Sequence, residues 1–271
     1  MLIDVQRMTT TLTTAMAEGA ERVRVFREIQ EVESAAAEYE PSARLRGGER
    51  HGQQIDGFDG DNSPRAYMRS ALDLGGKTLL FTTTNGSKAA QFVKHAAELV
   101  LGSFVNLQAV RRASLSRGLP VLLVCSGTAG ERSDEDELFA GVVALQLLQI
   151  RGQGSVGSPV QGEVADHLTL EIVQRTAAIL GVPCEVTVAG QQPSATSSTE
   201  RLAANSGAEL GQQDPVDAIA ALEKTIRTST NGLMLAKIGL VEDFEVILDV
   251  DRYGSTLPKY DRETDCFTVA K

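Results

Sequence analysis

Apolar runs with strand character alternate along this chain with longer segments that have apolar residues at helical spacing. Leu2–Val5, Lys77–Thr84 and Leu119–Val124 are strand-like. The helical segments between them include Thr10–Gly19 and Ser87–Ala97. Because helices of this length separate the strands, the connections are long enough for parallel crossovers. The alternation predicts an α/β protein with three layers, α/β/α, and a largely parallel or mixed sheet.

Four polar blocks accompany the apolar runs, and three of them follow a strand-like run and precede a helical pattern. The blocks are Asp4–Thr11, Gly47–Gly52, Thr82–Ser87 and Cys125–Asp136. In an α/β sheet, this junction brings backbone N–H groups and a helix N-terminus to one crevice. The blocks supply hydroxyls, an amide, arginines and carboxylates, which together suit a phosphate group and a hard cation. We therefore expect the four blocks to meet at a single site.

Carboxylates in these blocks are predicted to hold Mg²⁺, which prefers oxygen ligands. Asp4 ends the first strand, and Glu135 and Asp136 stand in the first turn of the helix predicted over Glu135–Ile150. Each has a structural alternative. Asp4 suits a turn or a helix cap, and Ser133 with Asp136 approximates a capping box.

Cationic and hydroxyl side chains are predicted to bind the phosphate. Arg7 and Thr9–Thr11 precede the first helix, and Thr82–Asn85 repeats this arrangement at another strand end. Arginine is favoured because its planar fork of donors matches phosphate oxygens. The threonines are equally well explained as β-prone or capping residues.

Composition limits the partners of such a site. Lys plus Arg number 26 and Asp plus Glu 36, a formal net charge of −10. No broad basic field exists to collect nucleic acid or an anionic membrane. No run approaches the roughly 18 apolar residues of a membrane span, and Asp4 and Arg7 interrupt any signal peptide. We expect a cytoplasmic protein that binds a small anionic phospho-acid, neither nucleic acid nor membrane.

The amino-acid composition of the chain changes near residue 150. The stretches 152–162 and 191–213 are rich in small and polar residues, Gly, Ser and Gln among them. We expect residues 1–150 to form the α/β region with the phosphate and metal site. Residues 151–271 are expected to form a second α/β subdomain with flexible stretches, and the two subdomains to share a cleft. Within the second part, Phe244–Val250 is predicted to be a strand.

The order of the blocks carries a family resemblance. The matching residues are Asp4-Val5-x-Arg7-x-Thr9-Thr10, Gly48-Glu49-Arg50, Asn62-Ser63-Pro64, Thr83-Thr84-Asn85-Gly86, Ser126-Gly127-x-x-Gly130 and Ser133-x-Glu135-Asp136. A weaker match comprises Asn231-Gly232, Leu235, Gly239, Asp243 and Pro258. In these residues the chain resembles the 2-phosphosulfolactate phosphatase family. The resemblance covers residues 1 to about 150 well and 229–271 loosely.

The resemblance implies a magnesium-dependent phosphatase that hydrolyses 2-phospho-3-sulfolactate or a similar small 2-phospho acid, in the route towards coenzyme M. It implies catalytic roles for Asp4, Arg7, Glu49 and Arg50, and metal ligation by Asp4, Glu135 and Asp136. The implied substrate-binding residues are Thr9, Thr10, Asn62, Ser63, Thr83, Thr84, Asn85, Gly86, Ser126 and Gly127. Gln6 and Met8 depart from the family pattern, and this departure bears on the sulfonate preference.

Two other functions stay open at the level of sequence. One is a non-catalytic small-anion-binding protein with the same pocket. The other is a phosphatase that uses Asp249 as nucleophile, because an apolar run followed by Asp249-x-Asp251 resembles the start of the aspartyl-phosphate enzymes. Direct attack by water and a phosphoenzyme are both open, as is a homodimer formed through exposed apolar helix faces.

Overall fold

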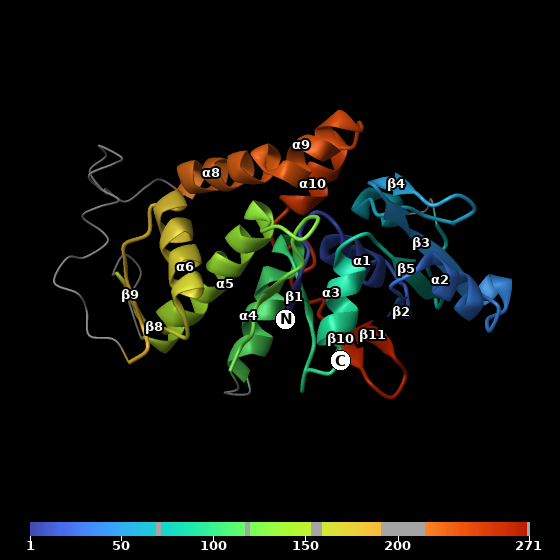
Figure 1. Cartoon of the computed structure of the whole chain (residues 1–271), viewed down its shortest axis with the longest axis horizontal. Helices are drawn as coiled ribbons and strands as arrows, with labels where there is room; N and C mark the ends of the chain where they lie inside the picture. The colour runs from blue at the N-terminus through green and yellow to red at the C-terminus, as the bar shows by residue number, and fades with distance from the viewer. Residues whose placement is uncertain (69–71, 117–119, 153–158, 191–214, 270–271) are drawn as a thin grey trace. The chain divides into compact units, whose positions relative to one another are not determined.

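The computed structural model describes residues 1–68, 72–116, 120–152, 159–190 and 215–269, which belong to two compact units (Figure 1). The first unit comprises Met1–Asp136 and Arg227–Lys271, and the second comprises Glu137–Ile226. The C-terminal segment therefore belongs with the N-terminal region, whereas the sequence pattern suggested a division near residue 150. Most of the two stretches that are rich in small and polar residues lies outside the described residues, at positions 153–158 and 191–214.

The described residues of the first unit form two sheets. In the smaller one, β1 (Leu2–Ile3) lies between β6 (Leu101–Gly102) and β7 (Val124–Cys125), and both pairings are parallel. The larger sheet has the order β10-β11-β2-β5-β3-β4. Its strands are β2 (Arg22–Val25), β3 (Arg44–Arg50), β4 (Gln53–Gln54), β5 (Thr78–Thr82), β10 (Pro258–Asp261) and β11 (Cys266–Val269). Strand β5 pairs in parallel with β2 and β3, and the other pairings are antiparallel.

Helices follow the strands of this unit. They are α1 (Met8–Ala17), α2 (Ile29–Ala36), α3 (Gly86–Val93), α4 (Leu107–Ser116), α9 (Thr230–Lys237) and α10 (Phe244–Ile247), with the short 3₁₀ helices η1 (Pro41–Ala43), η2 (Pro64–Tyr67), η3 (Phe104–Asn106) and η4 (Val241–Asp243). Helix α5 (Asp134–Arg151) begins in the first unit and continues into the second. The α/β class with parallel and mixed sheets is thus confirmed.

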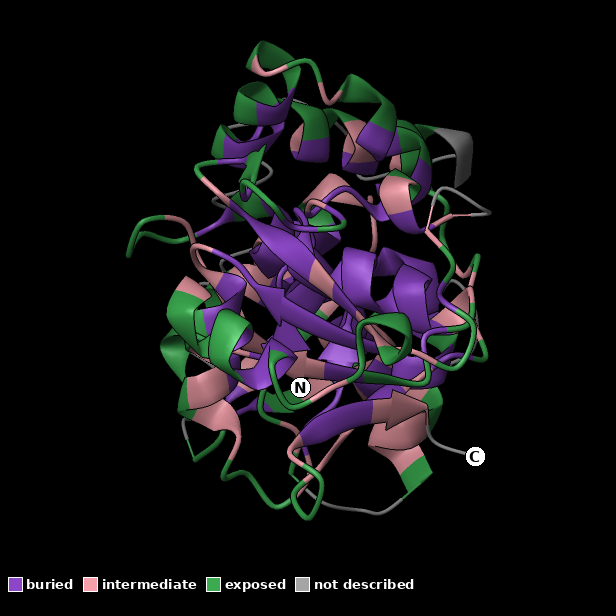
Figure 2. Ribbon diagram, turned by 90° about the vertical axis from the view of Figure 1, so that its right-hand side faces the viewer, coloured by how far each residue is buried: buried purple, intermediate pink, exposed green. Residues whose placement is uncertain are grey.

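Helix α1 lies in the core, and every residue from Met8 to Met16 is buried. Buried hydroxyls need hydrogen-bond partners, and its threonines find them largely in backbone carbonyls. Thr10 donates to the Val5 carbonyl at 2.9 Å, and Thr11 donates to the Asn62 carbonyl at 2.8 Å. A helix this rich in threonine is therefore fixed at the end of β1 both by packing and by hydroxyl bonds. The central strands are likewise buried in Figure 2.

The second unit is built around a parallel pair of strands. Strand β8 (Val160–Val164) leads through α6 (His167–Ile179) to β9 (Cys184–Val188), and α8 is Pro215–Thr228. Asp166 caps α6 by accepting a hydrogen bond from the Thr169 backbone at 2.8 Å. Apolar residues of α5, α6 and both strands form a separate core.

The polar block Gly47–Gly52 lies largely in β3, which ends at Arg50, and β4 follows at Gln53–Gln54. Gly48 makes this strand possible, because a Cβ there would lie 1.9 Å from the Thr82 carbonyl oxygen. The strand predicted over Leu119–Val124 is limited to β7, and Leu119 lies outside the described residues.

The predicted strand over Phe244–Val250 is wrong, because the chain forms α10 and then a turn. A short apolar run has no period that separates a strand from a buried helix. Within the described ranges, every helix falls short of the length and apolarity needed to cross a bilayer.

Candidate active site

The polar blocks converge where strands of the first unit end. Asp4 follows β1, Thr83 follows β5 and Ser126 follows β7, and each segment then leads into a helix or towards one. These are the carboxyl ends of strands in parallel pairings, where α/β proteins bind their ligands. The strands β1 and β7 belong to one sheet and β5 to the other, yet residues of Asp4–Thr11, Thr82–Ser87 and Cys125–Asp136 line one pocket.

A small pocket of about 190 Å³ opens at these strand ends. It is lined by Asp4, Gln6, Arg7, Glu49, His51, Gly52, Asn62, Thr83, Thr84, Asn85, Gly127, Thr128, Ala129, Asn231 and Met234, all from the first unit. Pockets for drug-sized ligands usually measure roughly 300–1,000 Å³. The smaller volume and the many polar groups indicate a compact, charged ligand.

Four buried carboxylates belong to the predicted blocks; Asp4 and Glu49 line the pocket, whereas Glu135 and Asp136 do not. Asp4, Glu49, Glu135 and Asp136 are each at most 7% exposed. Burial raises the pKa of Asp4 to about 7, a backbone N–H bond from Met8 lowers it, and the charges of Glu49 and Glu135 raise it further. Burial also raises the pKa of Asp136 well above its ordinary range, and the charges of Asp4 and Glu135 add to the rise. The cluster thus carries repulsion that a bound cation would relieve.

Asp136 also shapes the loop after β7. Its Oδ1 accepts a bond from the Val5 N–H at 2.8 Å, and its Oδ2 accepts bonds from the Ser126 hydroxyl at 3.2 Å and the Gly127 N–H at 3.3 Å. Glu135 accepts a bond from the Asn231 side-chain amide at 2.6 Å. These two carboxylates therefore link the segments after β1 and β7 to α9. Their negative charges also repel one another.

Glu49 performs the same task for the loop after β5. Its Oε1 accepts a bond from the Thr84 N–H at 2.7 Å, and its Oε2 accepts bonds from the Gly52 N–H at 2.7 Å and the Thr84 hydroxyl at 3.1 Å. A charged carboxylate that holds two backbone N–H groups is a strong anchor. Glu49 thus fixes the loop that leads into α3.

Gly86, the first residue of α3, allows Asp4 to approach this helix. A Cβ at position 86 would lie 2.1 Å from Oδ2 of Asp4 and 2.9 Å from the Met8 sulfur. No side chain fits there unless Asp4 moves. The glycine predicted as a binding residue therefore has a steric role beside the pocket, and only this residue type permits the observed position of the carboxylate.

Arg7 lies on the wall of the pocket and is 3% exposed. Its Nη1 donates to Asp243 at 3.0 Å and its Nη2 to the Gly52 carbonyl at 3.2 Å. The Ser63 hydroxyl donates to the other carboxylate oxygen of Asp243. Asn62 also lines the pocket, and its side-chain oxygen has no partner among the described residues.

Eight of the predicted site residues do not line the pocket: Thr9, Thr10, Arg50, Ser63, Gly86, Ser126, Glu135 and Asp136. Thr9 and Thr10 are fully buried, and their hydroxyls donate to backbone carbonyls. The Arg50 guanidinium donates to the carbonyls of Glu49 and Arg27 and to the Thr82 hydroxyl, and Arg50 does not line the pocket. A sequence pattern places these residues near a strand end, whereas the side-chain direction depends on neighbours that the pattern does not show.

Other residues reach the site without having been predicted there. His51, Thr128, Asn231 and Met234 line the pocket, and Asp243 holds Arg7. His51 has a left-handed backbone conformation, with a φ of 55°. The weaker family match in Asn231 and Asp243 was the available sequence signal, but nothing local to those residues indicated a site more than 200 residues away.

The structure contradicts the alternative hypothesis that Asp249 is the nucleophile. Asp249 follows α10 rather than a strand, and its side chain is 45% exposed. It pairs with Arg252 at 2.7 Å, three residues along the chain, and it does not line the pocket. A solvated turn explains the Asp249-x-Asp251 pattern.

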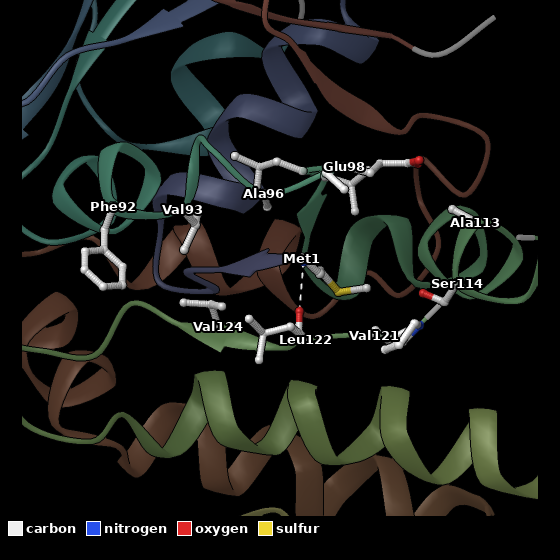
Figure 3. A pocket seen from close by; sticks show the side chains of 14 residues that line it. Met1, Phe92, Val93, Ala96, Glu98, Ala113, Ser114, Val121, Leu122 and Val124 are labelled. Atoms are coloured by element: carbon white, nitrogen blue, oxygen red, sulfur yellow. Dashed lines mark hydrogen bonds between the residues drawn. The ribbon is translucent and has the colours of Figure 1, made fainter. Parts of the chain in front are cut away.

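A larger pocket, of about 510 Å³, lies elsewhere in the first unit (Figure 3). Its labelled side chains are mostly apolar and include Phe92, Val93, Leu122 and Val124. The hydrogen bond drawn there runs from the Met1 amino group to the Leu122 carbonyl at 2.9 Å. Because it lacks the converging polar groups of a reaction site, the smaller polar pocket is the candidate active site.

Fold and site together define an α/β protein with a small polar pocket lined by Asp4, Arg7 and Glu49. A sequence model described as 2-phosphosulpholactate phosphatase matches residues 1–175. The chain therefore belongs to the 2-phosphosulfolactate phosphatase family.

Curated relatives agree with this assignment. The chain is 38% identical over 147 residues, 54% of its length, to a protein of Caldanaerobacter subterraneus subsp. tengcongensis, and it covers 60% of that protein. It is 34% identical over 176 residues, 65% of its length, to a protein of Gloeobacter violaceus, and it covers 74% of that protein. Both relatives are named "Probable 2-phosphosulfolactate phosphatase". The chain thus spans only about three fifths of the first relative.

Proposed function

We propose that this protein hydrolyses the phosphate monoester of 2-phospho-3-sulfolactate or of a similar small 2-phospho acid. Family membership and the names of the relatives support this proposal. The observation that carries it is the meeting of the Asp4 carboxylate and the Arg7 guanidinium on the wall of one small pocket. A doubly anionic substrate needs both a cation-binding side and a cationic donor in such a space.

We propose further that Mg²⁺ binds to the carboxylates of Asp4, Glu135 and Asp136. Their chemistry suits the ion, because they are buried oxygen ligands whose charges repel one another. Among the described residues, no group of three or more acidic, histidine or cysteine side chains stands ready to hold a metal. Mg²⁺ commonly takes only one or two carboxylates together with water and substrate phosphate, so Asp4, which lines the pocket, would suffice with one of the other two. When bound, the ion neutralises phosphate charge.

The protein's own groups would orient the substrate. The loop Thr83–Gly86 leads into the N-terminus of α3, where backbone N–H groups favour an anion. Glu49 holds this loop through Thr84, which keeps the N–H groups in place. Arg7 and Asn62 offer further polar atoms on the wall of the pocket. The proposed division of labour is therefore metal binding by carboxylates and anion binding by the loop and Arg7.

The test is phosphate release from 2-phospho-3-sulfolactate by the purified protein, with Mg²⁺ and with EDTA. We expect release only with the metal, and a loss of about 100-fold or more for Asp4→Asn, because the metal supplies several kcal/mol of charge stabilisation. Asp249→Asn is the matched control and should retain full activity, since Asp249 is exposed and outside the pocket. No release under any metal condition, combined with tight anion binding, would instead favour a binding protein.

A further inference from the structure

The Arg7 guanidinium is held rigidly but is not saturated. It carries five N–H donors. Among the described residues, Nη1 donates to Asp243 and Nη2 donates to the Gly52 carbonyl. The side chain is 3% exposed and lines the pocket, so solvent does not occupy the rest of its fork freely. Arg7 therefore retains donors for a ligand while its orientation is fixed from behind.

Asp243 provides this fixation from a distant part of the chain. It lies at the end of η4, is 1% exposed, and accepts bonds from both Arg7 and the Ser63 hydroxyl. Burial raises the pKa of Asp243, whereas the Ser63 bond and the charge of Arg7 lower it. Arg7 and Asp243 balance each other's charge in the interior. Asp243 also lies beyond residue 175, where the family match ends.

Asn62 stands beside this pair with an unused polar atom. The residue is 4% exposed, it lines the pocket, and its side-chain oxygen has no partner among the described residues. Its backbone carbonyl accepts the Thr11 hydroxyl at 2.8 Å, which anchors the residue. A buried amide oxygen without a partner is unfavourable, and an oxyanion has no hydrogen to donate to it. Rotation of the amide by 180° would put the N–H₂ group in its place, and that group would donate to an anion.

The position of the buried carboxylates indicates which anionic group of the substrate contacts Arg7 and Asn62. The phosphate that is transferred needs the bound cation, and the buried acidic groups able to hold one are Asp4 and its neighbours. Arg7 is already compensated by Asp243, so it suits a singly charged oxyanion better than a phosphate dianion. We propose that Arg7 and Asn62 form the subsite for the group that is not transferred, the sulfonate or carboxylate of the substrate. Asp243 and Ser63 are positioning residues for Arg7. This inference rests on the proposed function.

Binding measurements test the inference without requiring turnover. Isothermal titration in the presence of Mg²⁺ should compare 3-sulfolactate, lactate and inorganic phosphate on the full chain. For Asn62→Ala and Asp243→Asn, the Kd of 3-sulfolactate should rise by about tenfold, the effect of one lost charge-assisted hydrogen bond, while that of phosphate stays within about twofold. Ser63→Ala should show a smaller change of the same kind.

The matched control is Glu245→Gln, because Glu245 follows Asp243 closely but pairs with Arg65 at the surface, at 2.7 Å. It should leave all three dissociation constants unchanged. Lactate carries only a carboxylate. Loss of lactate binding in the variants would place the carboxylate in the subsite, whereas loss for 3-sulfolactate alone would place the sulfonate there. Both results support the subsite.

Other outcomes overturn the inference. They are equal weakening of phosphate and 3-sulfolactate, weakening of phosphate alone, no change in any variant, or failure of the wild type to bind 3-sulfolactate. A merely structural role for Asp243 would lower the melting temperature without changing the ratio of the two constants. If Asp243→Asn does not fold, Asn62→Ala and Ser63→Ala still decide. A protein that binds as expected but releases no phosphate would refute the proposed function and leave the subsite standing.

Discussion

Replacing Gly86 by alanine tests whether the position of the Asp4 carboxylate governs activity. The added Cβ would lie 2.1 Å from Oδ2 of Asp4, and ordinary contact begins at 3.4 Å. Subtraction gives 3.4 − 2.1, or about 1.3 Å, as the displacement that the carboxylate or the helix must accept. Met8 blocks one route of relaxation, because its Cβ would be 3.0 Å from the new methyl group. The carboxylate therefore has to move.

The expected effect falls on activity more than on stability. A misplacement of about 1 Å at a reacting site costs on the order of 100-fold in rate, which is about 2.7 kcal/mol of activation free energy. Steric crowding should cost roughly 1–3 kcal/mol of unfolding free energy, and the better helix propensity of alanine should return about 1 kcal/mol. The net destabilisation is then about 0–2 kcal/mol, which leaves the protein folded.

The assay combines kcat/KM for phosphate release with urea unfolding and Mg²⁺ titration. The control is Gly75→Ala, whose new Cβ would meet its nearest atom at 3.6 Å, an ordinary contact. We expect the control to keep its activity and its metal affinity. Wild-type kcat/KM and Mg²⁺ affinity in folded Gly86→Ala would refute the argument, since the Asp4 position would then be irrelevant to catalysis.

Three further predictions concern the residues around Asp4. Thr9→Val should lower the unfolding free energy by about 1–3 kcal/mol, because the Asp4 N–H loses its acceptor. The kcat/KM of the folded protein should change little. A large loss of kcat/KM at unchanged stability would instead favour contact between Thr9 and the substrate. Arg50→Gln should keep kcat/KM within about threefold, because its guanidinium bonds to carbonyls outside the pocket; a loss above about 100-fold would restore it to the catalytic set. The pKa of Asp4 is raised to about 7, so the folded state binds this proton more tightly than the unfolded state does. Its stabilising contribution is complete below the ordinary pKa of 3.8 and is lost as the pH rises through about 7. The proposed Mg²⁺ would then replace the proton, so melting curves should show a larger Mg²⁺ stabilisation at pH 8 than at pH 5.

Local sequence pattern was sufficient where a segment's environment follows from its own residues. The region around Thr78–Thr82 is both β-prone and buried on every residue, so the predicted strand and β5 agree. The helix predicted over Glu135–Ile150 agrees with α5. The pattern failed for Phe244–Val250, where the chain forms α10 and then a turn.

For the candidate site too, the sequence predicted some features and not others. Strand ends followed by polar residues marked Asp4, Thr83 and Gly127, because the ends of parallel strands share an edge of the sheet. The direction of a side chain is not encoded in this way. Arg7 and Arg50 are both arginines in predicted blocks, yet only Arg7 lines the pocket. Its partner Asp243 is separated from it by 236 positions in the sequence.

The sequence alone determined the α/β class, the strand ends that bear chemistry and the family pattern, because hydrophobic period and block order are properties of the linear chain. Tertiary structure decided which groups meet. It brought Asn231 to Glu135 and Asp243 to Arg7, and it directed the Thr9 and Arg50 donors to backbone carbonyls. Burial is the physical reason, since a polar group removed from water must pair with whatever the fold places beside it.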